Sequence, residues 1–299
     1  MVHAEPGIGA FLKARRAALE PADVGLPEGL NRRRVRGLRR EEVAQLAGIS
    51  VDYYTRIEQG RAPAISDSVL DAVARALRLS EYETGYLRNV AAPPRHDTAH
   101  QEQRVRPEVR RLLDAMGDAV PAVVIGRGMD ILAWNHLGGL LSFDLDALEP
   151  HRRNSALLVF LEPAARAYYP EWDRIAEEIV GNLRAETGRH PNDPRLCRLV
   201  GELLERSTDF RRVWEAQEVR ECLRGEKRLL HPEVGELRLA FEGLRLAVES
   251  DQLLMTYTAV PGTRTEERLR ALARIGSRGA PGAGAGPRPS VRPAVPEHV

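Results

Sequence analysis

Residues 40–59, REEVAQLAGISVDYYTRIEQ, have the pattern of two short helices that meet at a tight turn. Apolar residues recur at helical spacing on one face of each helix, namely Val43, Leu46 and Ala47 in the first and Tyr54 and Ile57 in the second. Ala44 is small enough for the two helices to cross closely. The stretch therefore predicts a pair of packed helices.

The residues between the two helices fit a tight turn. Gly48 can adopt the positive φ that ends the first helix, and Ile49 would fill the gap between the helices. Ser50 is placed to cap the second helix by accepting a hydrogen bond from its free amides. This combination is typical of a helix-turn-helix, the motif that inserts its second helix into the DNA major groove.

In this motif the early residues of the second helix meet base edges, while its apolar residues stay inside. We therefore expect DNA contacts from Ser50, Val51, Asp52, Tyr53, Thr55 and Arg56. Arg56 could pair with a guanine or contact a phosphate instead. Asp52 could accept from a cytosine or merely favour the helix dipole, and Val51 could touch a thymine methyl group. Glu58 is expected to pair within the bundle, because DNA would repel its charge.

Six arginines lie within nine residues next to the helix pair: Arg32, Arg33, Arg34, Arg36, Arg39 and Arg40. The chain has 42 arginines and only two lysines, so arginine enrichment is also a general property of this sequence. Because the cluster adjoins the helix pair, we favour binding of DNA phosphates, which gives affinity independent of sequence. Arg40 is expected on a phosphate rather than a base, and Arg61, just beyond the second helix, is a further DNA-binding candidate.

The composition is that of an ordinary globular protein. With 299 residues, 43% of them hydrophobic, the chain is long enough for two domains. It has no apolar run long enough to span a membrane and no secretory leader, so we expect a cytoplasmic protein that does not bind membranes. The net charge of +1 carries no information about nucleic acid. Cys197 and Cys222 lack metal-ligand spacing and are expected to be reduced thiols.

The N-terminal region predicts a compact helical domain over residues 1–92. Helical patterns at 8–19, 66–77 and 81–90 join the helix pair to make five helices, with Ser66 as a cap of the third pattern. The segment 93–106 begins with prolines and has few apolar residues, so we expect a linker.

Residues 107–275 predict a second domain of α+β type. After a helix at 108–116, strands are expected at 122–126, 131–134, 227–231, 236–241 (with 244–248 as a candidate continuation) and 252–259. Three helical pieces between 162 and 219 and a last helix at 265–275 complete it. This order predicts an antiparallel sheet with helices covering one face, and a sensor-like domain is a natural candidate. The tail 276–299 is expected to be disordered.

Residues 37–61, GLRREEVAQLAGISVDYYTRIEQGR, resemble the XRE (phage-repressor) class and, more narrowly, the MmyB-like transcription regulators. The second half is similar to the latter family at 121–122 (PA), 134–135 (WN), 160–166 (FLEPAAR), Tyr169, 188–193 (GRHPND), 199–203 (LVGEL), 210–214 (FRRVW), 227–237 (KRLLHPEVGEL) and 257–262 (YTAVPG). The resemblance implies an N-terminal all-α helix-turn-helix bundle and a C-terminal α+β PAS-like domain that can hold a fatty-acid-like molecule. Gln217 departs from the family, which often has a histidine there.

Apolar ligands bind in cavities lined by aliphatic and aromatic groups with a few polar anchors. Candidate lining residues, for each of which simple core is the default role, are Trp134, Phe160, Trp172, Trp214, Phe241, Met255 and Tyr257. Asn135 could anchor a ligand head group or cap the helix that follows its strand. His231 is a ligand candidate whose default role is structural, and Arg184 could bind a carboxylate or be solvated.

The sequence contains no phosphate-binding glycine loop, zinc-type spacing or nucleophile elbow, so we expect neither an enzyme nor a metal or cofactor. We expect a homodimeric, sequence-specific transcription regulator that binds a near-palindromic operator in double-stranded DNA and responds to a small apolar ligand. Two alternatives stay open: the second domain could be a protein-interaction module, or an enzyme domain tethered to DNA.

Overall fold

The computed structural model describes residues 7–27, 37–62, 64–91, 103–143, 145–248 and 251–278. The chain forms two compact units, one with residues 1–102 and 176–222 and the other with residues 103–175 and 223–299. The first unit thus combines the N-terminal helices with a later helical segment. The predicted linker at residues 93–106, as the boundary between two consecutive domains, remains a prediction.

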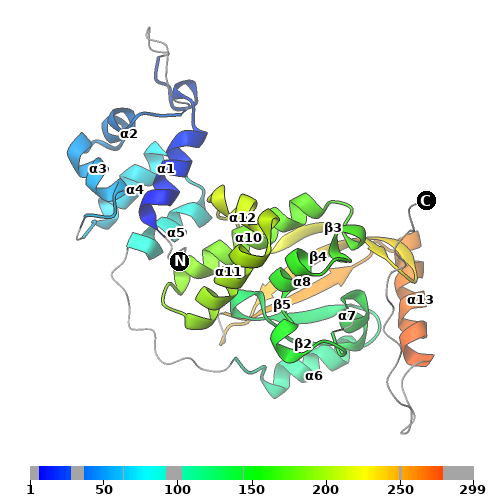
Figure 1. Ribbon diagram of the computed structural model, residues 1–299. Helices are drawn as coiled ribbons and strands as arrows, with labels where there is room; N and C mark the ends of the chain where they lie inside the picture. The colour runs from blue at the N-terminus through cyan, green and yellow to red at the C-terminus, as the bar shows by residue number, and fades with distance from the viewer. Residues whose placement is uncertain are drawn as a thin grey trace, which may run out of the picture. The chain divides into compact units, whose positions relative to one another are not determined.

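The N-terminal part of the first unit is a bundle of five α-helices (blue to cyan in Figure 1): α1 Ile8–Ala18, α2 Arg40–Ala47, α3 Val51–Glu58, α4 Asp67–Ala76 and α5 Glu81–Ala91. A short 3-10 helix, Pro21–Val24, follows α1. Helix α2 contacts α3 and α4, and α1 contacts α3 and α5. Their buried apolar side chains form one cluster around Phe11, Val43 and Tyr54. The predicted all-α helical bundle is confirmed.

The turn between α2 and α3 has the predicted geometry. Gly48 ends α2 at φ 66°, and Ile49 packs half-buried against the core. The Ser50 hydroxyl oxygen accepts the Tyr53 amide at 3.2 Å and caps α3. One orientation was predicted wrongly: Leu46 is 36% exposed, because α2 turns Val43, Ala44 and Ala47 inward instead. The small Ala44 side chain therefore faces the neighbouring helices, as the close crossing requires.

The later part of the first unit contains α11, Pro194–Arg206, α12, Thr208–Glu215, and most of α10, Trp172–Arg189. Asp193 caps α11 and Ser207 caps α12 through their side-chain oxygens. Apolar residues of each helix are buried, among them Ile179 of α10, Val200 of α11 and Val213 of α12. The three predicted helical pieces therefore correspond to these three helices.

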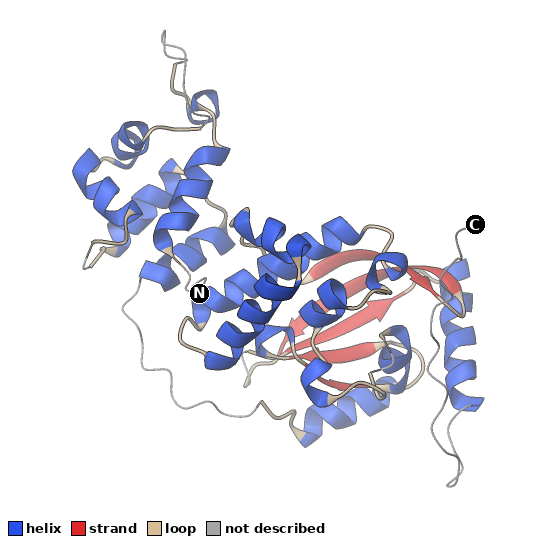
Figure 2. Cartoon of the chain, in the orientation of Figure 1, coloured by secondary structure: helices blue, strands red, loops and turns tan. Residues whose placement is uncertain are grey.

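The second unit is built on one five-stranded antiparallel sheet (red in Figure 2) with the order β2-β1-β5-β4-β3. Its strands are β1 Ala122–Ile125, β2 Ile131–Trp134, β3 Arg224–His231, β4 Gly235–Arg245 and β5 Leu253–Thr258. The last strand, β5, is the central one and pairs with both β1 and β4. Strand β4 runs unbroken to Arg245, so residues 244–245 continue it as the sequence allowed.

Helices cover both faces of the sheet, but more of them lie on one face than on the other. Helix α6, Pro107–Met116, packs on Val124 and Leu254 of one face. The opposite face carries Val123, Phe241 and Met255, which pack with Leu158. Above that face lie α7 His136–Leu141, α8 Ser155–Leu161, α9 Ala165–Tyr168 and the final helix α13, Arg264–Arg278, as the apolar clusters show. The α+β prediction is confirmed, although α8 was not expected from the sequence.

Among the described residues, no helix is long and apolar enough to cross a membrane.

Candidate DNA-binding surface and ligand-binding residues

The side chains of α3 divide into an inner and an outer set. Tyr54 and Ile57 are fully buried, as predicted. The residues expected to contact DNA are exposed or half-buried: Ser50, Val51, Asp52, Tyr53, Thr55 and Arg56. Val51 is aliphatic and yet 40% exposed. The capped N-terminal half of α3 therefore presents a mixed apolar, acidic and basic surface.

Glu58 at the end of α3 is the electrostatic centre of the bundle. Its carboxylate is buried and accepts hydrogen bonds from Arg16 Nε at 3.0 Å and Arg40 Nε at 2.9 Å. Burial acts to raise the pKa of Glu58, but the hydrogen bonds and charges of the two arginines outweigh it and hold the pKa below its usual range. Glu58 thus pairs within the bundle, as its charge led us to expect.

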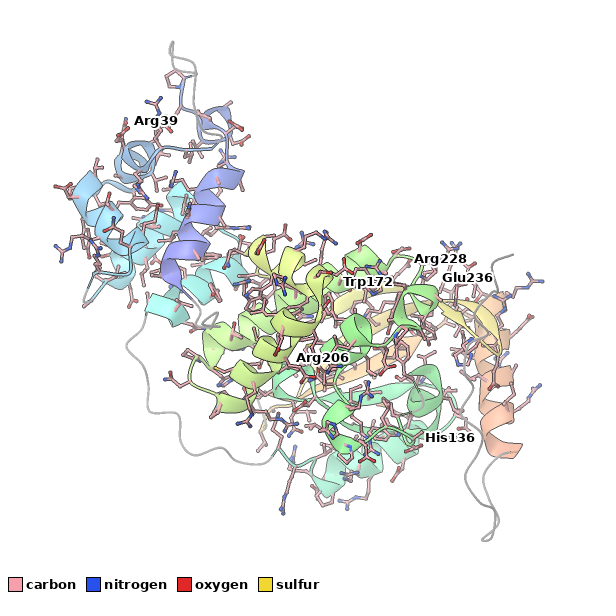
Figure 3. The ribbon with its side chains drawn as sticks, in the orientation of Figure 1. Arg39, His136, Trp172, Arg206, Arg228 and Glu236 are labelled. Carbon is pink, nitrogen blue, oxygen red and sulfur yellow. The ribbon has the colours of Figure 1, made fainter. Side chains whose placement is uncertain are left out.

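The predicted phosphate-binding arginines differ in their surroundings. Arg40 pairs with Glu58, yet 45% of its side chain stays exposed. Arg39 extends into solvent at the start of α2 (Figure 3), where its backbone amide donates to Glu42. Arg61 is also exposed. The predicted DNA-binding candidates Arg32, Arg33, Arg34 and Arg36 lie outside the described residues.

The apolar ligand candidates fall into three groups rather than one. Four of them share one face of the sheet, namely Trp134, Phe241, Met255 and Tyr257. Phe160 and Trp172 form an edge-to-face pair with ring centroids 5.5 Å apart, and the Trp172 indole donates to the Val159 carbonyl. Trp214 on α12 stacks on Phe210 at 5.4 Å.

Asn135 has a structural role. Its side-chain oxygen accepts the amides of Gly138 at 2.8 Å and Ala122 at 3.0 Å. Its amide group donates to the carbonyls of Val120 at 2.8 Å and Gly117 at 3.0 Å. These four bonds use the full hydrogen-bonding capacity of the side chain. The sequence left two roles open for Asn135, ligand anchor or helix cap, and in the structure Asn135 caps α7.

His231 is buried, and both its ring nitrogens have backbone partners. Nδ1 accepts the Glu233 amide at 3.2 Å, so the proton lies on Nε2, which donates to the Leu140 carbonyl at 3.1 Å. Burial is the main cause that lowers the pKa of His231, against the opposing effects of Leu140 and Glu233. This is the default structural histidine that the sequence predicted.

Arg184 on α10 is only 2% exposed, so it is not a solvated arginine. Its guanidinium donates to the Gln217 side-chain oxygen at 2.6 Å and to the Trp214 carbonyl, and lies 3.8 Å from the Trp214 ring centroid. Burial lowers its pKa, while the nearby Tyr86 hydroxyl acts in the opposite direction. Arg184 differs from the other ligand-binding candidates because it is a buried cation whose hydrogen-bond acceptors, Gln217 and the Trp214 carbonyl, are neutral.

Two groups near these candidates were not identified from the sequence. Tyr86 on α5, near Arg184, was assigned only to a helix pattern. Phe143, Tyr168 and Tyr169 form a ring cluster with centroids 5.0–6.2 Å apart. Tyr169 did appear in a stretch similar to the family, which was the one available signal.

No group of His, Cys, Asp or Glu side chains suited to a metal ion occurs in the described parts of the chain. The sequence model of the family described as the MmyB-like transcription regulator ligand binding domain matches residues 105–272, more than half of the chain. The chain belongs to this family. A helix-turn-helix domain model matches residues 8–87 of this MmyB-like regulator, over α1–α5. No curated protein matches the chain. The two matches together assign a DNA-binding transcription regulator.

Proposed function

We propose that this MmyB-like regulator binds a specific DNA sequence through α3 and that a small apolar, fatty-acid-like ligand modulates this binding. The observation that carries the DNA part is the outer face of α3, where Val51, Asp52 and Arg56 project from a helix fixed by the Gly48 turn and the Ser50 cap. Such a helix can enter the major groove without first having to be ordered.

The ligand part is supported by the sheet face that carries Trp134, Phe241, Met255 and Tyr257 next to the helices over it. Aromatic and aliphatic side chains with few polar groups suit a hydrocarbon chain. Control of DNA binding then requires that the ligand has different affinities for the DNA-competent and DNA-incompetent states.

The proposal includes a homodimer acting in the cytoplasm, where its DNA target would lie. Two copies of α3 would sit about 34–36 Å apart on DNA, which implies a near-palindromic operator with half-sites one helical turn apart.

DNA recognition is tested by selecting binding sites from a pool of random duplexes with the full chain. We expect an enriched near-palindromic sequence that binds at least about 1,000-fold more tightly than random DNA. An unenriched pool with salt-dependent binding would leave only non-specific affinity and contradict sequence-specific recognition.

Ligand binding is tested by native mass spectrometry of freshly purified chain. We expect a mass excess that matches a lipid, and a change in operator affinity after the lipid is extracted. A chain that never carries or takes up lipid contradicts the sensor, and co-purification of a stoichiometric protein instead would favour the interaction module. If the chain still binds its operator in either case, the DNA-binding part of the proposal is unaffected.

A further inference from the structure

The buried carboxylate of Glu58 joins two arginines that come from different helices. Arg16 of α1 donates from Nε to Glu58 Oε2 at 3.0 Å and from Nη2 to Oε1 at 3.2 Å. Arg40, the first residue of α2, donates from Nε to Oε1 at 2.9 Å, and its Nη2 lies 2.8 Å from the same oxygen. The Arg16–Glu58–Arg40 network therefore ties the start of α2 and the end of α3 to α1.

The two arginines of this network differ in what their remaining nitrogen does. Arg16 Nη1 donates to the Leu38 carbonyl at 2.6 Å, and the Leu38 amide donates back to the Arg16 carbonyl at 2.9 Å. Arg40 Nη1 has no acceptor among the residues that the structure describes, and 45% of the Arg40 side chain is exposed. One end of the network is thus closed within the bundle, and the other end is open to solvent.

The open end of the network is held in a fixed orientation. A solvated arginine loses rotamer freedom when it binds a phosphate, and this loss weakens the contact. Arg40 already has Nε and Nη2 fixed on Glu58, and because a guanidinium is planar, these two contacts also set the direction of Nη1. Although burial acts to raise it, the pKa of Glu58 stays below its usual range beside the two arginines, so the carboxylate that holds Arg40 is ionised at neutral pH.

We propose that Glu58 is a positioning residue for DNA binding, which holds Arg40 so that its Nη1 donates to a DNA phosphate. This inference rests on the DNA-binding role of the bundle and gives a function in it to an acid whose charge alone would repel DNA. In a helix-turn-helix the first helix crosses the DNA backbone, which places the start of α2 near a phosphate. The first turn of α2 also contains Glu41 and Glu42, so the helix dipole by itself attracts phosphate weakly there, and the fixed guanidinium supplies the cation.

The sign of the effect of Glu58 on DNA affinity separates positioning from simple charge. Glu58→Gln removes a negative charge, and by attraction to phosphates alone this would tighten DNA binding. If Glu58 positions Arg40, the same substitution frees the guanidinium and weakens DNA binding instead. Arg40→Lys provides a second variant, because it keeps the positive charge and the Arg16–Glu58 pair but replaces the planar guanidinium by a flexible ammonium group.

The test measures fluorescence anisotropy of a labelled random-sequence duplex titrated with the full chain, at a temperature at which circular dichroism shows each variant to be folded. A random duplex suffices because a phosphate contact needs no particular base. We expect Glu58→Gln to weaken binding about 10-fold and Arg40→Lys about 3–10-fold. Asp71→Asn and Arg88→Lys are the matched controls: they make the same changes of charge in the more exposed ion pair between α4 and α5 and should not weaken DNA binding.

A double-mutant cycle separates positioning from a merely structural role. In an Arg40→Gln background, Glu58→Gln should have no further effect on DNA affinity, whereas an acid that acts only through Arg16 and the fold would weaken binding as much as in the wild type. That second result overturns the inference, as does unchanged or tighter DNA binding by Glu58→Gln. If Glu58→Gln does not fold, Arg40→Lys decides, and wild-type affinity of this variant overturns the inference. A wild-type chain that binds no DNA overturns the DNA-binding proposal as well, whereas a failed operator selection alone affects only sequence recognition.

Discussion

The ring of Tyr86 on α5 lies against Gly188 on α10 so closely that a Cβ at position 188 would come 2.4 Å from the ring Cδ2. The ring is buried, and it packs against Phe11 with centroids 4.9 Å apart, so it has little room to move. Ala185 and Val219 join the same apolar cluster. Gly188 therefore lets α5 approach α10 closely, beside Arg184.

Replacing Gly188 by alanine should separate these helices. We expect Gly188→Ala to lower the free energy of unfolding by about 1–3 kcal/mol, because overpacking outweighs the gain in helix propensity. Gly201→Ala on α11 is the control: nothing lies within 4 Å of the added Cβ, so it should stabilise by about 1 kcal/mol. Urea unfolding measures both, and equal effects would show that Tyr86 yields to the methyl group.

The N-terminal cap of α3 can be tested with two serines. Ser50 caps α3 through its side chain, whereas Ser66 begins α4 without a side-chain cap bond. Ser50→Ala should cost about 1 kcal/mol of stability, and Ser66→Ala should cost little. A comparable loss in both variants, measured by thermal unfolding, would mean that the Ser50 hydrogen bond contributes nothing.

Removing the charge of Glu58 should leave two arginines without their shared acid. We expect Glu58→Gln to destabilise the protein by about 3 kcal/mol, as loss of one partner of a buried ion pair does. Glu41→Gln, in the exposed first turn of α2, should cost less than about 1 kcal/mol. Chemical unfolding at pH 7 distinguishes the two variants, and similar small losses would contradict the central role of Glu58.

Stability should fall in mild acid through His231. Its folded pKa is lowered, chiefly by burial, so the unfolded chain takes up the proton at a higher pH than the folded chain. This contribution is complete above the ordinary histidine pKa of about 6.5 and is lost as the pH falls below it. His231→Asn removes the titrating group and should flatten the unfolding free energy between about pH 7.5 and 5.5. Parallel wild-type and variant curves would refute this.

Base recognition by Arg56 predicts a sequence-dependent loss. Arg56→Ala should weaken binding to the selected operator by about 1–3 kcal/mol and relax specificity at one base pair. Arg61→Ala, the exposed arginine beyond α3, should weaken operator and random DNA alike if it contacts a phosphate. Gel-shift titrations on both duplexes measure this, and equal losses for Arg56→Ala on both would assign Arg56 to the backbone.

The local rules of helices and strands were sufficient for much of the fold. Gly48 and Ser50 act on neighbouring backbone atoms, so the α2–α3 turn was predictable from adjacent residues. The alternation in 236–241 likewise predicted β4. The rotation of α2 about its own axis could not be predicted. Leu46 and Ala44 both adjoin the apolar face of α2 that contains Val43, and only the approach of other helices decides which of the two is buried.

Contacts distant along the chain were beyond sequence patterns. Glu58 was expected to pair internally, but its partner Arg16 lies 42 residues away on another helix. The aromatic ligand candidates looked equivalent in the sequence, yet three-dimensional packing separates Trp214 from the group on the sheet. Arg184 had the sequence context of a solvated helix arginine, and its burial depends on Tyr86 and Gln217.

The central position of β5 has a consequence for synthesis. All helices of the DNA-binding bundle precede residue 92. Strand β1, in contrast, can pair with β5 (Val123 with Met255) only after β5 has been synthesised. Because chains emerge N-terminus first, α3 leaves the ribosome long before the second unit can complete its sheet. A chain that terminates before Leu253 would carry α3 without the strand that joins the two halves of the sheet, and would be a DNA-binding fragment without a complete second unit.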